Sequence, residues 1–373
     1  MAGRDEVAVP GVRIDSGFEV IPGARALGPA PLPYKLYESA PPEQFRLISK
    51  HASLMYLVSG VAQVLLTQLL HYEGAARRDT MLTVLCTYAG MLMVGVSSMA
   101  NDPLAVGPAV SLPMGRLVSL AIVDVAAHTI NTVALLLAGS SIFQMVNSSL
   151  VVFTAILAFI FLGRRLQPIQ YMAVAGITGG MLVGAIGVAD GGSGVAEAGD
   201  RLAGALLALT GTACSASLYV LNERVLKNYN VSPERMCFVV GLVGTALSLA
   251  YVCLYTMPRW DFLVTGSIEA HAGSIPRVMA CYVALFIASY IHNVAYFYMV
   301  GKSGAVAAGV LQAGRTALVI MLSGILFCGY DTVQCFTFNR SSAVGIICIA
   351  TLAYSMADAP EPLPPTLPTV HDA

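Results

Sequence analysis

The sequence predicts an all-α membrane protein with ten transmembrane helices, arranged as two inverted five-helix repeats. Its 373 residues are 57% hydrophobic and only 11% charged, whereas a soluble domain carries about 25% charged residues. The apolar residues gather in ten runs, most of them close to the ~20 residues that a spanning helix needs. Since each half contains an odd number of helices, a duplicated half enters the membrane with the opposite orientation.

The ten expected spans follow one another closely. In chain order they are Ser53–His71, Thr80–Met99, Arg116–Ala138, Ile142–Gly163, Ile169–Val188, Leu202–Arg224, Met236–Met257, Val278–Val300, Gly304–Cys328 and Ser342–Ala357. The Gly/Ser-rich segments Leu137–Ser141 and Val300–Gly304 predict tight turns between paired helices. Ala189–Arg201 and Pro258–Arg277 are the longer connections.

The flanking segments divide the chain further. Residues 1–50 are rich in Pro, Gly and charge and predict a disordered tail without a signal peptide, in which Pro42–His51 can form a short juxtamembrane helix. Residues 51–190 form the first half, 191–201 a lumenal linker, 202–357 the second half and 358–373 a Pro-rich disordered tail. The side of the N-terminus holds more than twice as many Lys and Arg residues as the other side, which predicts cytosolic termini.

The composition also excludes some partners. A net charge of −1 and the lack of a basic cluster interleaved with aromatics give no reason to expect a nucleic-acid partner. The Cys and His residues show no metal-binding spacing, so no metal or other cofactor is expected. Cys328 and Cys335 flank one short connection; the sequence leaves open whether they form a disulfide.

A weak recurrence supports the two-repeat prediction. His128 and Asn131 in the third span are followed by Gly139-Ser-Ser141, and His292 and Asn293 in the eighth by Gly301-Lys-Ser303. We expect Gly139 and Gly301 to be hinges. In the fifth span, small residues that let another helix approach closely indicate packing within the bundle, with a homodimer face as the alternative; they are Gly176, Gly179, Gly180, Gly184 and Gly187.

Arg315 is the strongest functional candidate, because it lies in the middle of the apolar ninth span. An arginine at bilayer depth costs at least ~2.5–3.5 kcal/mol and therefore faces a polar interior. It needs an acidic partner, an anionic ligand or carbonyl groups there. The rival interpretation is a structural ion pair with Asp124 of the third span. Glu223, beside Arg224, is interpreted as a solvated charge at the interface.

Other polar residues lie in the same spans and are expected to converge on a wetted cavity, because polar groups that face lipid are costly. Asp124, His128 and Asn131 share one helix face through their i, i+4, i+7 spacing. The structural alternative for the amides is bridging between helices. The candidate substrate-binding or coupling residues are Asp124, His128, Asn131, Gln144, Asn147, Gln312, Arg315, Asn293, Gln63 and Tyr219.

Two segments carry a resemblance to a known family. Ser140–Leu166, SSIFQMVNSSLVVFTAILAFIFLGRRL, resembles the fourth-helix signature of the drug/metabolite transporter superfamily, and in particular subfamily F of solute carrier family 35. VLQAGRTALVIMLSGILF in the ninth span resembles the Arg-Thr segment of that family, and the chloroquine-resistance transporter is similar at Gln312. Subfamily F tends to have an acidic residue where Gln312 stands, so Arg315 lacks a local partner here.

The resemblance implies alternating access around a central cavity, with Asp124, Gln144 and Arg315 at the acidic, Phe-Gln and basic positions of the family. We therefore expect a secondary transporter of a small polar or charged metabolite in an internal membrane, such as the lysosome, vacuole or Golgi, and not an enzyme. Asp124 with His128 is the expected proton-responsive element, because burial favours the neutral form of a carboxyl group. A nucleotide-sugar transporter, a channel and a non-transporting receptor are the alternatives.

Overall fold

The structure is a computed structural model that describes residues 43–101, 114–163, 166–189, 195–228, 231–331 and 334–356. Every regular element in these residues is helical, which confirms the predicted all-α class. The elements are α1 (Glu43–Tyr72), α2 (Leu82–Asn101), α3 (Met114–Asn147), α4 (Leu150–Leu162), α5 (Pro168–Ala189), α6 (Val195–Asn228), α7 (Pro233–Tyr251), η2 (Val252–Thr256), η3 (Met257–Arg259), η4 (Asp261–Thr265), α8 (Gly266–Ala270), α9 (Ile275–Ser303), α10 (Ala305–Phe327) and α11 (Phe338–Ser355).

Seven helical segments of the described residues are long and apolar enough to cross a membrane: His51–Tyr72, Gly115–Ser140, Ile142–Leu162, Gly199–Asn228, Pro233–Arg259, Ile275–Ser303 and Ala305–Phe327. Two apolar helices are shorter, Leu82–Ser98 and Pro168–Val183, and α11 covers the tenth predicted span. Large apolar side chains such as Phe161, Met172 and Leu254 stay exposed on the bundle, as expected for a surface in contact with lipid. The count of ten spans remains a prediction.

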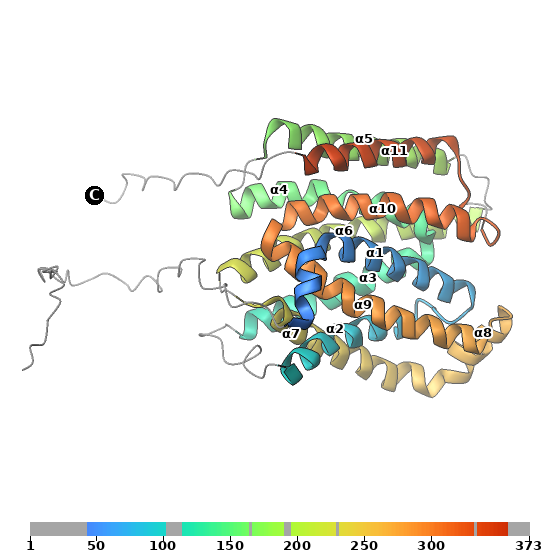
Figure 1. The fold of residues 1–373 in the computed structure, drawn as a ribbon. Coiled ribbons are helices and arrows are strands. Elements are labelled where there is room, and N and C mark those ends of the chain that lie inside the picture. Colours follow the sequence, from blue (N-terminus) through green and yellow to red (C-terminus); the bar gives the residue numbers. More distant parts are fainter. Residues whose placement is uncertain are drawn as a thin grey trace, which may run out of the picture. The chain divides into compact units, whose positions relative to one another are not determined.

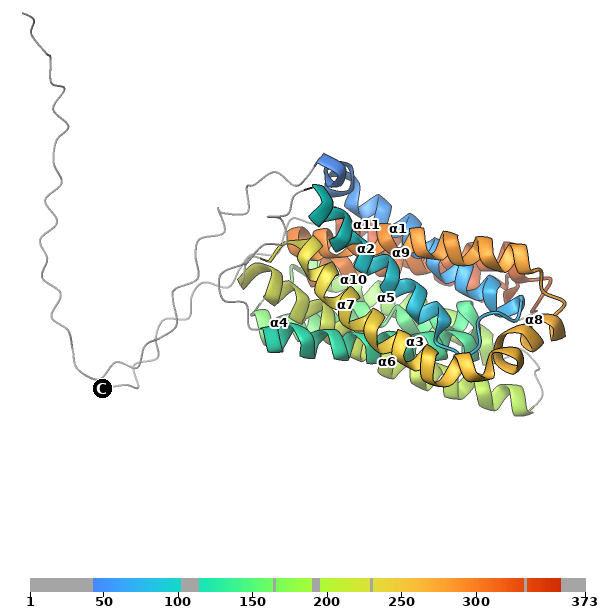
Figure 2. The same cartoon turned by 90° about the horizontal axis from the view of Figure 1, so that it is seen from below.

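Helices from the two halves pack in corresponding pairs. Helix α3 packs on α6 as α1 packs on α9, while α2 pairs with α7 and α5 with α11 (Figures 1 and 2). Helices α1, α2, α3 and α5 correspond to the first, second, third and fifth predicted spans, and α6, α7, α9 and α11 correspond to the sixth, seventh, eighth and tenth. When each span is replaced by its counterpart in the other half, the same four pairs result. The packing is therefore consistent with an inverted repeat.

The small residues of α5 serve the pairing with α11. A Cβ built on Gly176 would lie 3.0 Å from the Cβ of Ala350, and one on Gly180 would lie 2.9 Å from Ile347. Gly179 has open space instead. Two of these glycines therefore allow close contact within the bundle, and the homodimer face stays a prediction.

Two glycines mark the turns between paired helices. Gly139 has a φ of 76° at a kink inside α3, and Gly304 has a φ of 93° between α9 and α10. A left-handed backbone is costly for residues with a Cβ, so glycine is required at both positions. The expected hinge at Gly301 is corrected: that residue lies in helix α9, and the turn is made at Gly304.

The ends of the predicted segments differ in detail from the expectation. Helix α1 begins at Glu43 and is interrupted at His51, which confirms the short helix before the first span. Helix α6 begins at Val195, inside the predicted linker, and the connection after residue 258 contains η4 and α8. Residues 1–42 of the predicted N-terminal tail and all of the predicted C-terminal tail, 358–373, lie outside the described residues.

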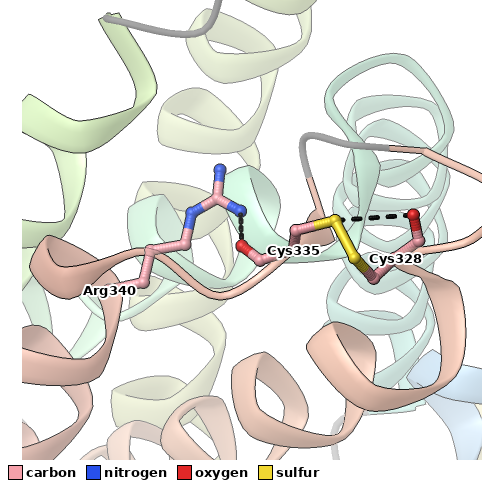
Figure 3. The surroundings of a disulfide bond; sticks show 3 residues. All are labelled: Cys328, Cys335 and Arg340. Carbon is pink, nitrogen blue, oxygen red and sulfur yellow. Dashed lines mark hydrogen bonds between the residues drawn. A yellow bond between two sulfur atoms is a disulfide. The ribbon is translucent and has the colours of Figure 1, made fainter.

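Cys328 and Cys335 are joined by a disulfide in the connection between α10 and α11. Figure 3 shows that Nη1 of Arg340 donates a hydrogen bond to the carbonyl of Cys335 at 2.9 Å. The pairing that the sequence left open is therefore present, and Arg340 fixes the start of α11 beside it.

Candidate functional site

A cavity of about 210 Å³ lies between the helices, lined by residues of α1, α2, α3, α4, α6, α9 and α10. Most of the candidates from the sequence line it: Gln63, Asp124, His128, Asn131, Asn147, Tyr219, Asn293, Gln312 and Arg315. The polar stripes of separate helices thus converge, because each helix turns its polar side away from the lipid.

Arg315 is buried, with 9% of its surface exposed, and no carboxylate of the described residues forms an ion pair with it. Its Nη1 lies 3.5 Å from Nε2 of His292, and its guanidinium lies 5.9 Å from the centre of the Tyr56 ring. Its Nε has no hydrogen-bond partner among the described residues. A Cβ on Gly60 would lie 2.5 Å from Cδ of Arg315, so α1 approaches the arginine closely.

The hydrogen bonds of His292 fix its tautomer. Arginine can only donate, so Nε2 of His292 accepts from Arg315, and Nδ1 donates to the carbonyl of Tyr56 at 3.2 Å. The imidazole also stacks on the Tyr56 ring, with ring centres 4.6 Å apart. A neutral histidine is therefore the protein partner of Arg315 in this structure.

Tyr56 also connects three helices beside the arginine. Its hydroxyl donates to Oε1 of Gln312 at 2.8 Å and lies 2.7 Å from the hydroxyl of Tyr219. Gln312 therefore acts as a hydrogen-bond acceptor in the place where related sequences were expected to have an acid. These contacts bind α1 to α6 and α10.

Asp124 has its own contacts in the wall of the cavity. Its Oδ2 accepts a hydrogen bond from the hydroxyl of Tyr88 at 2.8 Å, and the Tyr88 ring meets the His128 ring edge-on at 5.5 Å. Asp124 and Arg315 form no ion pair with each other in the described structure. The structural pairing considered from the sequence is therefore absent in this conformation.

The amide side chains bridge helices around the cavity. Gln63 donates to Ser289 Oγ at 2.8 Å, and Asn131 donates to Ser215 Oγ at 2.9 Å. Asn147 accepts from Thr212 at 3.2 Å. Asn293 donates to a backbone carbonyl of its own helix. Most of these amides thus combine a bridging contact with a place in the cavity wall.

Gln144 is the one candidate that does not line the cavity. It is fully buried, and its Oε1 accepts a hydrogen bond from Thr316 Oγ at 3.1 Å.

Two residues of the site, Tyr56 and Tyr88, were not among the candidates predicted from the sequence. A tyrosine in an apolar helix carries no strong signal, since most of its ring is itself apolar.

Glu223 is corrected by the structure. It was expected to be a solvated charge, but its side chain is fully buried. It accepts hydrogen bonds from Nζ of Lys227 at 2.7 Å and from the backbone N–H of Ala305 at 2.6 Å. The carboxylate therefore caps the N-terminus of α10, the helix that carries Arg315.

The lining of the cavity extends toward the ends of several helices. It reaches Thr67, near the end of α1, and Thr83, in the first turn of α2. Tyr219 and Gln312, which Tyr56 bridges, line it as well.

Comparison with known proteins agrees with this architecture. "Solute carrier family 35 member F6" of Homo sapiens is 28% identical over 215 residues, which cover 54% of this chain and 57% of the human protein. The protein of the same name from Rattus norvegicus is 27% identical over 195 residues, and an uncharacterized protein of Schizosaccharomyces pombe is 21% identical over 203 residues. The matched region thus spans between 50% and 61% of the length of these relatives.

A solved structure titled "Crystal structure of protein" shares the fold, with a TM-score of 0.57 and 18% sequence identity over 82% of this chain and 96% of that one. The UAA transporter family matches residues 52–358, which include all the described helices from the first span to the last. A helical membrane bundle, a polar central cavity and this match lead to one conclusion: the chain is an integral membrane protein that belongs to the UAA transporter family.

Proposed function

We propose that this chain is a secondary transporter that moves a small polar or charged metabolite across an internal membrane by alternating access. The observation that carries the proposal is the buried Arg315, which faces the cavity without a carboxylate partner. A fixed charge in such a place is costly unless a ligand compensates it. The human and rat relatives are named solute carriers, which also supports a transport function.

The size of the cavity favours a small substrate. At about 210 Å³ it is smaller than the ~300–1,000 Å³ of sites for drug-sized ligands. A small metabolite is therefore the better fit to the conformation described.

Alternating access is supported by the glycine turns. A rearrangement that separates α1 from α6 and α10 requires the hydrogen bonds of Tyr56 to Gln312 and Tyr219 to break. Gly139 and Gly304 are the positions at which the paired helices can rotate. We further propose coupling to protons through Asp124 and His128, which lie together in the cavity wall.

The test is uptake from a complete metabolite extract into liposomes that contain the purified full-length protein, read out by mass spectrometry. We expect saturable accumulation of a few compounds, faster uptake when the liposomes are preloaded with the same compound, and loss of both in Arg315→Ala. Linear, non-saturating flux would instead indicate a channel, and binding without flux would indicate a receptor.

Proton coupling has its own arm in that experiment. An inward proton gradient should accelerate wild-type uptake, and Asp124→Asn should remove this acceleration. Uptake that ignores the gradient, with Asp124→Asn fully active, would contradict coupling and leave transport itself established.

A further inference from the structure

Two groups of opposite charge line one cavity without neutralising each other. Asp124 and Arg315 both belong to the wall of the 210 Å³ cavity, and no ion pair joins them. The other titratable side chains of the lining are His128, His292, Tyr88, Tyr219 and Tyr296. The cavity therefore presents one negative and one positive site and has no excess of either charge.

The positive site is prepared for an anionic group. Arg315 is held by a neutral imidazole acceptor at 3.5 Å, which is a long contact, and its Nε has no partner among the described residues. A carboxylate on a ligand provides a stronger acceptor than the imidazole, because it accepts charge-assisted hydrogen bonds from the guanidinium.

The negative site is prepared for a cationic group. Among the described residues, the Asp124 carboxylate receives one hydrogen bond, from Tyr88. The Oδ1 of Asn131, two turns further along α3, faces Gly211 of α6, where a Cβ would lie 2.2 Å from it. An ammonium group donates three hydrogen bonds and accepts none, so the Asp124 carboxylate matches its chemistry.

The rest of the wall contains apolar side chains, including Leu135, Phe143, Leu218, Leu285 and Phe297. Such a lining suits a hydrocarbon segment between two charged ends. A ligand with a single charge would compensate one site and leave the other buried charge without a partner, which is costly when the cavity closes.

We propose that the transported metabolite is a small zwitterion, whose carboxylate binds Arg315 and whose ammonium binds Asp124. This inference rests on the proposed transport function and names the chemical class of its substrate. A zwitterion neutralises both charges in one step, so the closed state contains no unpaired charge.

The experiment measures binding to the purified full-length protein in lipid nanodiscs by titration calorimetry. The probes are three unbranched five-carbon compounds: 5-aminopentanoate, pentanoate and pentylamine. We expect the zwitterion to bind the wild type at least ~10-fold more tightly than either singly charged compound, since one charge-assisted contact is worth about 1.5–3 kcal/mol. A series of unbranched amino acids with two to six carbons should show one optimum length.

Two isosteric variants test the assignment of each end. Asp124→Asn should remove the advantage of 5-aminopentanoate over pentanoate, and Arg315→Gln should remove its advantage over pentylamine. Asp79→Asn, in the loop before α2, and Arg259→Gln, exposed beside Tyr255, alter the same charges outside the cavity and should keep the wild-type order. Thermal unfolding checks that all variants are folded.

Equal affinity of wild type for pentanoate and 5-aminopentanoate would overturn the proposal, as would an equal loss for all three probes in both variants. Failure of the whole series to bind wild type would overturn it as well. Uptake from the metabolite extract reports on transport independently, so a wrong substrate class is distinguished from a protein that does not transport.

Discussion

Glu223 of α6 accepts a hydrogen bond from the backbone amide of Ala305, the first residue of α10, at 2.6 Å. Gly304 provides no side chain to cap that helix, so the carboxylate of another helix replaces the cap. Since α10 carries Gln312 and Arg315, this buried contact fixes the position of the cavity's positive site relative to α6.

We predict that Glu223→Ala lowers the free energy of unfolding by about 2–3 kcal/mol, because it leaves the N–H of Ala305 and the ammonium of Lys227 without their acceptor. Glu223→Gln keeps an acceptor oxygen and should cost about 1 kcal/mol. Thermal unfolding of the purified protein measures both. Glu269→Gln, on an exposed glutamate, is the control and should leave the midpoint unchanged.

The turn between α9 and α10 predicts opposite effects of two neighbouring substitutions. Gly304→Ala forces a Cβ into a left-handed backbone and should destabilise the protein by about 1–2 kcal/mol. Gly301→Ala lies in a helix, where the new Cβ comes no closer than 3.8 Å to Leu226, and should be neutral or stabilising by up to ~1 kcal/mol. Equal unfolding midpoints for the two variants would contradict the placement of the turn.

Stability in acid should depend on Glu73, in the connection after α1. A backbone hydrogen bond from Ser274, together with the contact from Arg277, holds the pKa of Glu73 below its ordinary value of 4.5. Because the pKa is lower in the folded state, this contribution is complete above ~4.5 and is lost as the pH falls toward the folded pKa. Unfolding midpoints measured between neutral and acidic pH should decline less steeply for Glu73→Gln than for wild type. If both decline equally, Glu73 has no part in the acid response.

Gly60, on α1, predicts a functional effect because of its close approach to Arg315. A methyl group on Gly60 would lie 2.5 Å from Cδ of Arg315 and 2.7 Å from Cε1 of His292, so Gly60→Ala must displace the arginine or its histidine partner. We expect uptake to fall at least ~10-fold, since small displacements of a binding group are costly. Gly179→Ala, in open space on α5, is the matched control. Normal uptake by Gly60→Ala would show that Arg315 does not need its described position.

The all-α class and most of the spans could be predicted from sequence because each apolar run forms its helix locally: lipid offers no hydrogen bonds to the backbone, so every segment satisfies its own. The polar candidates could also be predicted, since Asp124 and Arg315 are charged residues in segments that are otherwise apolar. The tight turns were also visible in composition, although which glycine takes the positive φ was not.

Only the tertiary structure decided how each helix is rotated and which neighbour it meets. It turned Gln144 toward Thr316 and away from the cavity, brought Tyr56 between Gln312 and His292, and buried Glu223 against the start of α10. These contacts join residues far apart in the chain, so no local pattern contains them. The sequence by itself therefore determined that a charge lies within the membrane at Arg315, and packing decided that its partner is a neutral histidine and an open cavity.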